Sequence, residues 1–170
     1  MSLINVIDFK SLGDDRGELI AIENNKNIPF EIKRVYYVFN TKKNVAWGFH
    51  AHRELKQIAI CVSGSCKFIM DDGKVKESYT LDTPEKGLFI DKMQWHEMED
   101  FSDDCVLLVL ASDIYDESDY IRNYSDFIEM VNQNVYTPVK WLSLIHISEP
   151  TRRTPISYAV FCLKKNIAPR

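Results

Sequence analysis

The chain has 170 residues, of which 45% are hydrophobic and 27% charged, and its formal net charge is −4. These values are typical of a soluble globular protein with one domain. No apolar run approaches the roughly 20 residues that cross a bilayer, and the N-terminus lacks the basic start and apolar stretch of a secretory signal, so we expect no membrane association and a cytoplasmic location.

The charge is unevenly distributed. Residues 142–170 contain one acid and five bases, which leaves 24 acids against 16 lysines and arginines in the rest of the chain. A body with this acidic excess and without a basic stripe predicts no nucleic-acid partner. A phosphorylated substrate is still compatible, because a few local arginines can hold one.

Short β-type runs separated by turn residues follow one another from Asn5 to Ala111. Asp72-Gly73 and the stretch Val62–Ser65 predict tight turns between such runs. The runs recur about every ten residues without helical periodicity, which predicts an all-β jelly roll of antiparallel strands. The expected strands cover residues 5–9, 18–23, 32–39, 45–52, 57–62, 66–70, 76–81, 87–90, 94–98 and 105–111.

Residues 116–131 differ from the preceding runs, because acids come first and apolar residues then recur at helical spacing. This pattern predicts one C-terminal amphipathic helix. The four cysteines form no CxxC pair and show no metal-ligand spacing. Cys61 and Cys66 fall in apolar runs, where we expect buried, reduced thiols.

The segment 142–165, LSLIHISEPTRRTPISYAVFCLKK, is unlike everything before it. LSLIHISEPTR resembles one reading frame of a transposase-type sequencing adapter, and ISYAVFCL resembles the flow-cell adapter that follows it. We therefore divide the chain into a domain of residues 1–141 and an artefactual tail of residues 142–170, which we exclude from functional reasoning.

Only three histidines remain once the tail is excluded: His50, His52 and His96. In a strand, His50 and His52 would project from one face and Ala51 from the other. Such a pair can be half of a metal site or an acid/base pair. Cupins typically add a glutamate four or five positions later, but Lys56 and Gln57 stand there, which favours proton transfer by neutral imidazoles over metal binding.

Several stretches together resemble the dTDP-4-keto-6-deoxyglucose 3,4-ketoisomerases of bacterial surface-sugar biosynthesis. They cover nearly all of residues 4–131: GDDRGELIAIE, IPFEIKRVYYVFNT, GFHAHRELKQ, SGSCKFIMDDG, WHEM and DCVLLVLASDIYDESDYIR. The resemblance implies a cupin-like fold, a homodimer, a dTDP-linked keto-deoxysugar substrate and no metal or other cofactor.

The resemblance also implies roles for individual residues. His50 and His52 would be catalytic; we assign the carbon-bound proton to His50 and the oxygen-bound proton to His52, although the two could be exchanged. Tyr36 and Gln57 would bind substrate, with Tyr37 an alternative to Tyr36.

Arg16 and His96, also expected to bind substrate, resemble the branch that forms galacto-configured products. One departure is Trp47, which stands where relatives usually have arginine. The alternatives left open are a metal-dependent cupin such as a dioxygenase, a non-catalytic sugar-nucleotide sensor and, with less support, a sugar-nucleotide epimerase.

Deleting residues 142–170 should leave turnover unchanged and alter the free energy of unfolding by no more than about 0.5 kcal/mol, the range of neutral surface changes. Thermal unfolding and turnover of the full-length and shortened chains provide the measurement. A markedly lower unfolding midpoint together with lost turnover would show that the tail is authentic protein.

Overall fold

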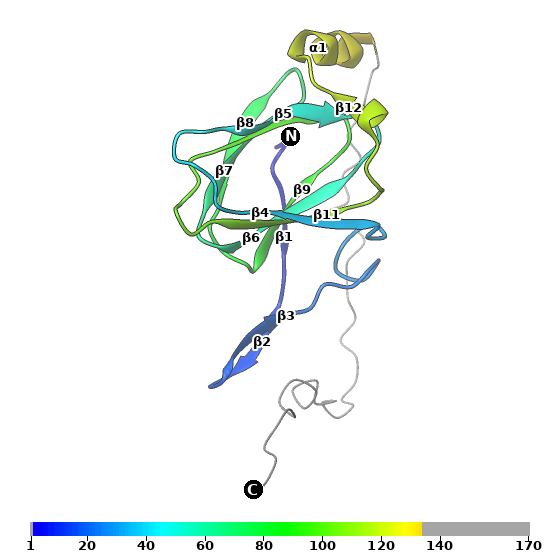
Figure 1. The fold of residues 1–170 in the computed structure, drawn as a ribbon. Coiled ribbons are helices and arrows are strands. Elements are labelled where there is room, and N and C mark those ends of the chain that lie inside the picture. Colours follow the sequence, from blue (N-terminus) through cyan, green and yellow to red (C-terminus); the bar gives the residue numbers. More distant parts are fainter. Residues whose placement is uncertain (1, 134–170) are drawn as a thin grey trace, which may run out of the picture. The chain divides into compact units, whose positions relative to one another are not determined.

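Two five-stranded antiparallel sheets face each other in the computed structural model, which describes residues 2–133 (Figure 1). Neighbouring strands of the first sheet are, in order, β1 (Asn5–Asp8), β9 (Lys86–Ile90), β6 (Gln57–Ser63), β11 (Val106–Ala111) and β4 (Arg34–Val38). Those of the second are β12 (Tyr120–Ile121), β5 (Trp47–His52), β10 (Trp95–Glu99), β7 (Cys66–Asp71) and β8 (Lys76–Leu81). With one C-terminal helix outside the sheets, this arrangement confirms the all-β jelly roll.

Each of the ten expected β-type runs overlaps a strand of the structure, but two strands were not predicted. One is β2 (Ser11–Asp14), which pairs with β3 (Gly17–Ile20) in a separate hairpin. The other is β12, which pairs with β5. Both are short and lack a clear alternation of apolar and polar residues, which is the signal that identifies a half-buried strand.

The alternation of side chains along the strands divides the apolar residues between two packed regions. The space between the sheets is filled from both sides by residues such as Phe68 and Met70 of β7 and Leu107 of β11. On β6, Ile58 and Ile60 point the other way and pack under the segment before β4. Successive residues of a strand thus serve opposite faces of the sheet.

Both predicted turns are confirmed, and each contains a glycine with positive φ. Gly64, between β6 and β7, has φ +67°, and Gly73, between β7 and β8, has φ +85°. Residues other than glycine rarely adopt a positive φ, because their Cβ atom then crowds the backbone. At Gly73 a Cβ would also lie 3.1 Å from Val131, so the turn approaches the C-terminal helix closely.

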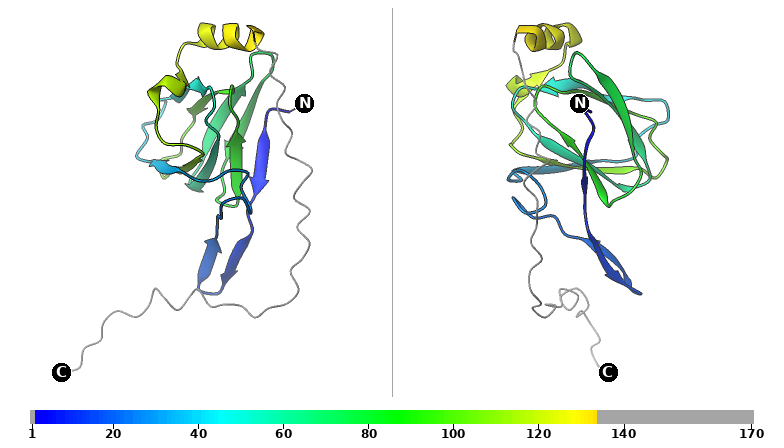
Figure 2. Two further views of the ribbon diagram at one scale, coloured as in Figure 1. Left: turned by 90° about the vertical axis from the view of Figure 1, so that its right-hand side faces the viewer. Right: turned by 180° about the vertical axis from the view of Figure 1, so that it is seen from behind.

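The prediction of a helix over residues 116–131 is wrong for the first half of that range. A 3₁₀ turn (η1, Glu117–Asp119) and β12 precede the helix α1, which runs from Tyr124 to Gln133. Asn123 caps α1, because its side-chain oxygen accepts the backbone N–H of Ser125 at 2.8 Å. The buried face of α1, formed by Phe127 and Val131, covers the outer face of the second sheet, as Figure 2 shows.

The hairpin β2–β3 projects away from the two sheets (Figure 1). Two of its leucines are half exposed, Leu12 at 48% and Leu19 at 53%.

No helix among residues 2–133 is long and apolar enough to cross a membrane. The proposed tail, residues 142–170, lies outside the described residues.

Replacing Phe127 by alanine should destabilise the protein by about 3–5 kcal/mol, the usual cost of removing a buried aromatic ring. Phe127 is fully buried and contacts Trp95, with ring centroids 5.8 Å apart. Chemical denaturation measures the change. The exposed Ser125 of the same helix provides the control, since Ser125→Ala should stay within about 0.5 kcal/mol of the parent. Equal stability of the two variants would contradict the packing of α1 on the sheet.

Candidate active site

The three histidines of the described chain lie together on adjacent strands of the second sheet. His50 and His52 share one side of β5, while Ala51 packs on the other side against α1. In the antiparallel pairing of β5 with β10, His96 stands directly opposite His50. The ring centroids are 4.4 Å apart for His50 and His96 and 4.9 Å for His50 and His52. The structure thus brings the histidines together as expected.

An irregularity in β5 helps to place His50. Gly48 has φ +91° and Phe49 has φ +55°, and the register with β10 shifts between His96 and Glu97. A Cβ at Gly48 would lie 2.7 Å from the carbonyl oxygen of His96. Glycine therefore allows the two backbones to approach, and the bulge turns the following residues of β5.

Each imidazole is held through Nδ1. The Nδ1 of His50 lies 2.9 Å from the carbonyl oxygen of Gly48, and that of His96 lies 3.2 Å from the carbonyl oxygen of Gln94. The Nδ1 of His52 lies 2.9 Å from Asp119 Oδ2. Because these oxygens accept hydrogen bonds, the arrangement assigns the proton of each neutral ring to Nδ1. Nε2 then carries the basic lone pair.

Asp119 is a site residue that the sequence analysis missed. Besides holding His52, its carboxylate accepts the backbone N–H of Glu54 at 2.8 Å and that of Leu55 at 3.3 Å. These bonds fix the carboxylate on the chain that immediately follows β5. Its place inside the wrongly predicted helix concealed this role, since acids at the start of a helix have an ordinary structural explanation.

Burial keeps the three imidazoles neutral. It lowers the pKa of His50, and burial together with the neighbouring His50 lowers the pKa of His52 to about 4, although Asp119 acts in the opposite direction. The pKa of His96 lies well below its usual value, again because of burial. All three rings are therefore available as proton acceptors at neutral pH.

Two further predicted residues meet each other across the first sheet. Gln57 Nε2 donates to the hydroxyl of Tyr36 at 2.9 Å. Burial raises the pKa of Tyr36 to about 12, so the phenol stays protonated. Tyr37 points to the opposite side and is 63% exposed. The structure therefore favours Tyr36 over Tyr37 as the site residue.

Three buried polar atoms of this region have no partner among the described residues: His52 Nε2, Gln57 Oε1 and Arg34 Nε. Buried polar groups are nearly always hydrogen-bonded, so such atoms mark a place where a polar ligand or water binds. Arg34, whose guanidinium lies 5.3 Å from the ring centre of Tyr36, was not predicted. Nothing in the sequence around Arg34 distinguished it from an ordinary surface arginine.

Tyr120 is another unpredicted neighbour of the histidines. Its ring centroid lies 4.3 Å from that of His52 and 5.0 Å from that of His50. Arg122 covers the tyrosine ring at 4.4 Å. Tyr120 reaches this position because β12 pairs with β5, whereas the sequence analysis had placed it in a helix.

Arg16 is not brought to the histidines of its own chain. It lies in the turn of the projecting hairpin, where its guanidinium pairs with Asp14 at 2.6 Å and its side chain is 70% exposed. Trp47, at the start of β5, is half exposed at 46%.

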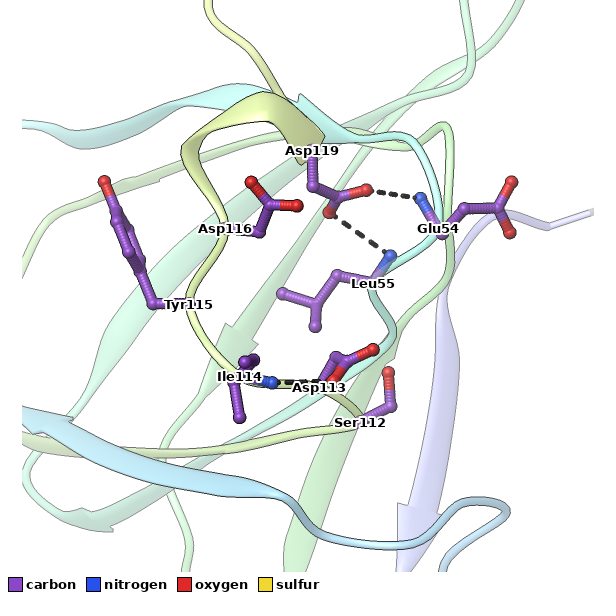
Figure 3. Close-up of a pocket in the computed structure, with 8 residues that line it drawn as sticks. All are labelled: Glu54, Leu55, Ser112, Asp113, Ile114, Tyr115, Asp116 and Asp119. Atoms are coloured by element: carbon purple, nitrogen blue, oxygen red, sulfur yellow. Dashed lines mark hydrogen bonds between the residues drawn. The ribbon is translucent and has the colours of Figure 1, made fainter.

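A pocket of about 490 Å³ is formed by residues that follow β5 and by the segment 112–119 (Figure 3). Asp119 lines it, together with Glu54, Asp113 and Asp116. Four carboxylates would repel the diphosphate of a nucleotide sugar, so this pocket does not suit such a substrate. The histidine side of Asp119, with its unpartnered donors and acceptors, suits it better.

The histidine cluster meets one requirement of a cupin metal centre but not the other. One ring nitrogen from each of the three histidines lies within 4.8 Å of the others. The carboxylate that completes the usual cupin set is missing, because Gln57 occupies its position and its amide is bonded to Tyr36. The donor set is therefore a poorer match to a divalent cation than to proton transfer.

Comparison with known proteins identifies the family of the chain. Residues 2–132 match the family described as FdtA: WxcM-like, C-terminal. A curated relative from Aneurinibacillus thermoaerophilus, TDP-4-oxo-6-deoxy-alpha-D-glucose-3,4-oxoisomerase, is 58% identical over 72% of this chain and 88% of its own.

Two solved structures extend the comparison. The WlaRB TDP-quinovose 3,4-ketoisomerase of Campylobacter jejuni is 50% identical, with a TM-score of 0.73 over 76% of this chain and 99% of its own. A histidine-to-asparagine mutant of QdtA from Thermoanaerobacterium thermosaccharolyticum, in complex with TDP-4-keto-6-deoxyglucose, is 41% identical, with a TM-score of 0.76 over 78% of this chain and 96% of its own. The chain therefore belongs to the FdtA, WxcM-like family of sugar 3,4-ketoisomerases.

Proposed function

We propose that this protein moves the keto group of dTDP-4-keto-6-deoxy-D-glucose from C4 to C3 and forms dTDP-3-keto-6-deoxy-D-galactose. The observation that carries the proposal is the cluster of three neutral imidazoles, each anchored through Nδ1 and each with a basic Nε2. The relatives are named for the same isomerisation, and one was solved with the 4-keto sugar bound.

The reaction needs one carbon-bound proton and one oxygen-bound proton to move. The C4 ketone acidifies the C3 proton, and a base that removes it produces an enediol. In this intermediate O4 gains a proton. Returning a proton to C4 while O3 gives up its proton then leaves a hydroxyl at C4 and the ketone at C3, so no atom is gained or lost. Two positioned acid/base groups are sufficient for this chemistry.

We assign the carbon-bound proton to His50 and the oxygen-bound proton to His52. His50 is the least buried of the three rings and lies between the other two. His52 is buried and its Nε2 has no partner among the described residues, as expected for a group that contacts a substrate oxygen. Tyr36, Gln57 and His96 would orient the sugar, and the mechanism requires no metal or other cofactor.

The protein is proposed to act as a homodimer. Apolar surface is exposed on the hairpin at Leu12 and Leu19 and on the outer face of β4 at Val35 and Tyr37. Such patches favour association. A dimer would also be compatible with a substrate-binding role for Arg16, because the hairpin holds this residue away from the histidines of its own chain.

We propose the galacto configuration for the product because Arg16 and His96 together resemble the galacto-forming branch of the family. It is a finer proposal than the isomerisation itself, because a similar relative is named for quinovose. We place the enzyme in the cytoplasm, since the buried cysteines Cys61, Cys66 and Cys105 are unpaired, as is usual in a reducing compartment.

The direct test is incubation of the purified protein with dTDP-4-keto-6-deoxyglucose and a chelator, followed by NMR of the product. We expect a 3-keto sugar of galacto configuration. A mainly gluco product would contradict the stereochemical assignment alone. Turnover that appears only after metal is added would contradict the metal-free mechanism and favour a metal-dependent cupin, whereas binding without turnover would favour a sensor.

His50→Asn and His52→Asn should each lower turnover by about 10²–10⁴-fold, the usual contribution of a positioned acid or base. His146→Asn, in the proposed tail, is the matched control and should retain full activity. Steady-state kinetics with the 4-keto sugar measure the effect, and circular dichroism verifies folding. Retained activity in both site variants would remove the pair from the mechanism.

Asp119→Asn should lower turnover by about 10–100-fold, because an amide no longer holds His52 in one tautomer. It should also shift the pH profile. Burial lowers the pKa of His50 and His52, so activity of the parent should persist below pH 6.5 and fall only at lower pH. Since the Asp119 carboxylate raises the pKa of His52, its removal should move the acid limb to still lower pH.

Asp116→Asn is the control for this experiment. Asp116 lines the same pocket and caps η1, but it has no bond to a histidine among the described contacts. Its profile should match that of the parent. An unchanged acid limb in Asp119→Asn would mean that Asp119 merely supports the loop.

A further inference from the structure

Three cysteines that are separate in the sequence meet inside the core. Cys61 lies near the end of β6, Cys66 opens β7 and Cys105 immediately precedes β11. Their sulfur atoms all lie within 4.8 Å of one another, and those of Cys61 and Cys105 are 3.7 Å apart. All three side chains are buried. The expectation of buried thiols is confirmed, but their convergence was missed because it depends on strand pairing.

The backbone around the sulfurs is held in place by two segments that bond to each other. In the turn between β6 and β7, Ser65 donates its N–H to Ser102 Oγ at 2.8 Å and accepts the N–H of Ser102 at 2.9 Å. A Cβ at Gly64 would lie only 2.2 Å from Ser102 Oγ, so the turn and the loop before Cys105 are in close contact. The three thiols are therefore preorganised.

The sulfur atoms of Cys61 and Cys105 have nearly the spacing found in a metal thiolate centre, and the sulfur of Cys66 lies within 4.8 Å of both. Metal–sulfur bonds of about 2.3 Å place sulfur atoms about 3.8–4.0 Å apart in tetrahedral or trigonal geometry. Thiolates select soft cations such as Cu(I) and Zn(II). We propose that Cys61, Cys66 and Cys105 bind one thiophilic cation, Cu(I) or Zn(II), at a site distinct from the histidine cluster.

The site lies away from the chemistry proposed for the enzyme. Gln57 opens β6 and Cys61 lies four residues further along the same strand, about 13 Å away at the usual rise per residue. Both face the space between the sheets, but Gln57 belongs to the substrate side. The bound cation would connect β6, β7 and the segment leading to β11, so its role would be to stabilise the fold.

Binding of the cation depends on whether the thiols are protonated. Burial raises the pKa of Cys105 to about 12, and the hydrogen bond to Cys61 together with burial raises the pKa of Cys66. A cation must displace these protons, so its affinity should rise with pH. Three sulfurs satisfy Cu(I), whereas Zn(II) requires a fourth donor. The carbonyl oxygen of Ser63, 3.0 Å from the Cys61 sulfur, is one candidate.

The test uses the full chain carrying Cys162→Ser, which removes the fourth cysteine, after reduction and removal of metal. Separate titrations with Cu(I) and Zn(II), followed by gel filtration and elemental analysis, give the stoichiometry. Titration with Co(II) reports sulfur ligation through charge-transfer absorption in the near ultraviolet. We expect about one equivalent of cation, sulfur-to-cobalt absorption and a raised midpoint of thermal unfolding.

Two variants separate the cysteine site from the histidines. Cys105→Ser, at the edge of a loop, and Cys66→Ala, in the core, should each abolish the sulfur absorption, while His96→Asn should preserve it. If Cys66→Ala fails to fold, Cys105→Ser still tests the proposal. Failure of both Cu(I) and Zn(II) to bind, or binding that is lost in His96→Asn but kept in Cys105→Ser, would overturn the proposal.

Discussion

The antiparallel pairing of β5 with β10 is the constraint on which the rest of the site depends. It sets His96 opposite His50, and the alternation of β5 then adds His52 on the same side. Ala51, facing the other way, is fully buried beneath α1, so the strand cannot slip by one residue without burying imidazoles under the helix. The core that holds the sheets together therefore also determines which side chains can reach a substrate.

Asp119 belongs both to the histidine cluster and to an acidic pocket. On one side its carboxylate orients His52, and the neighbouring buried atoms of Gln57 and Arg34 are left without partners. On the other side it joins three further carboxylates in the pocket of Figure 3. Asp119 thus orients His52, burial keeps the imidazoles neutral, and the acidic pocket disfavours a diphosphate. Proton transfer at a sugar carbon requires a base that is both unprotonated and correctly oriented.

Local patterns were enough to predict much of this fold and part of its site. The short β-type runs predicted the ten main strands, and the His-x-His spacing predicted that two imidazoles share one face of a strand. Asp119, Tyr120 and Arg34 could not be predicted, because each joins the site through the pairing of strands that are distant in the sequence. Acids followed by apolar residues made 116–131 look helical, although Asn123 delays the helix and β12 pairs with β5. The convergence of the three cysteines escaped prediction for the same reason.

The central claim is that histidines transfer the carbon-bound proton through an enediol. The most direct measurement is NMR of the product formed in heavy water at low conversion. Because a protonated imidazole exchanges with solvent, the account predicts deuterium at C4 of the 3-keto product. Complete transfer of the original C3 hydrogen to C4 without deuterium, as in a direct hydride shift, would contradict it.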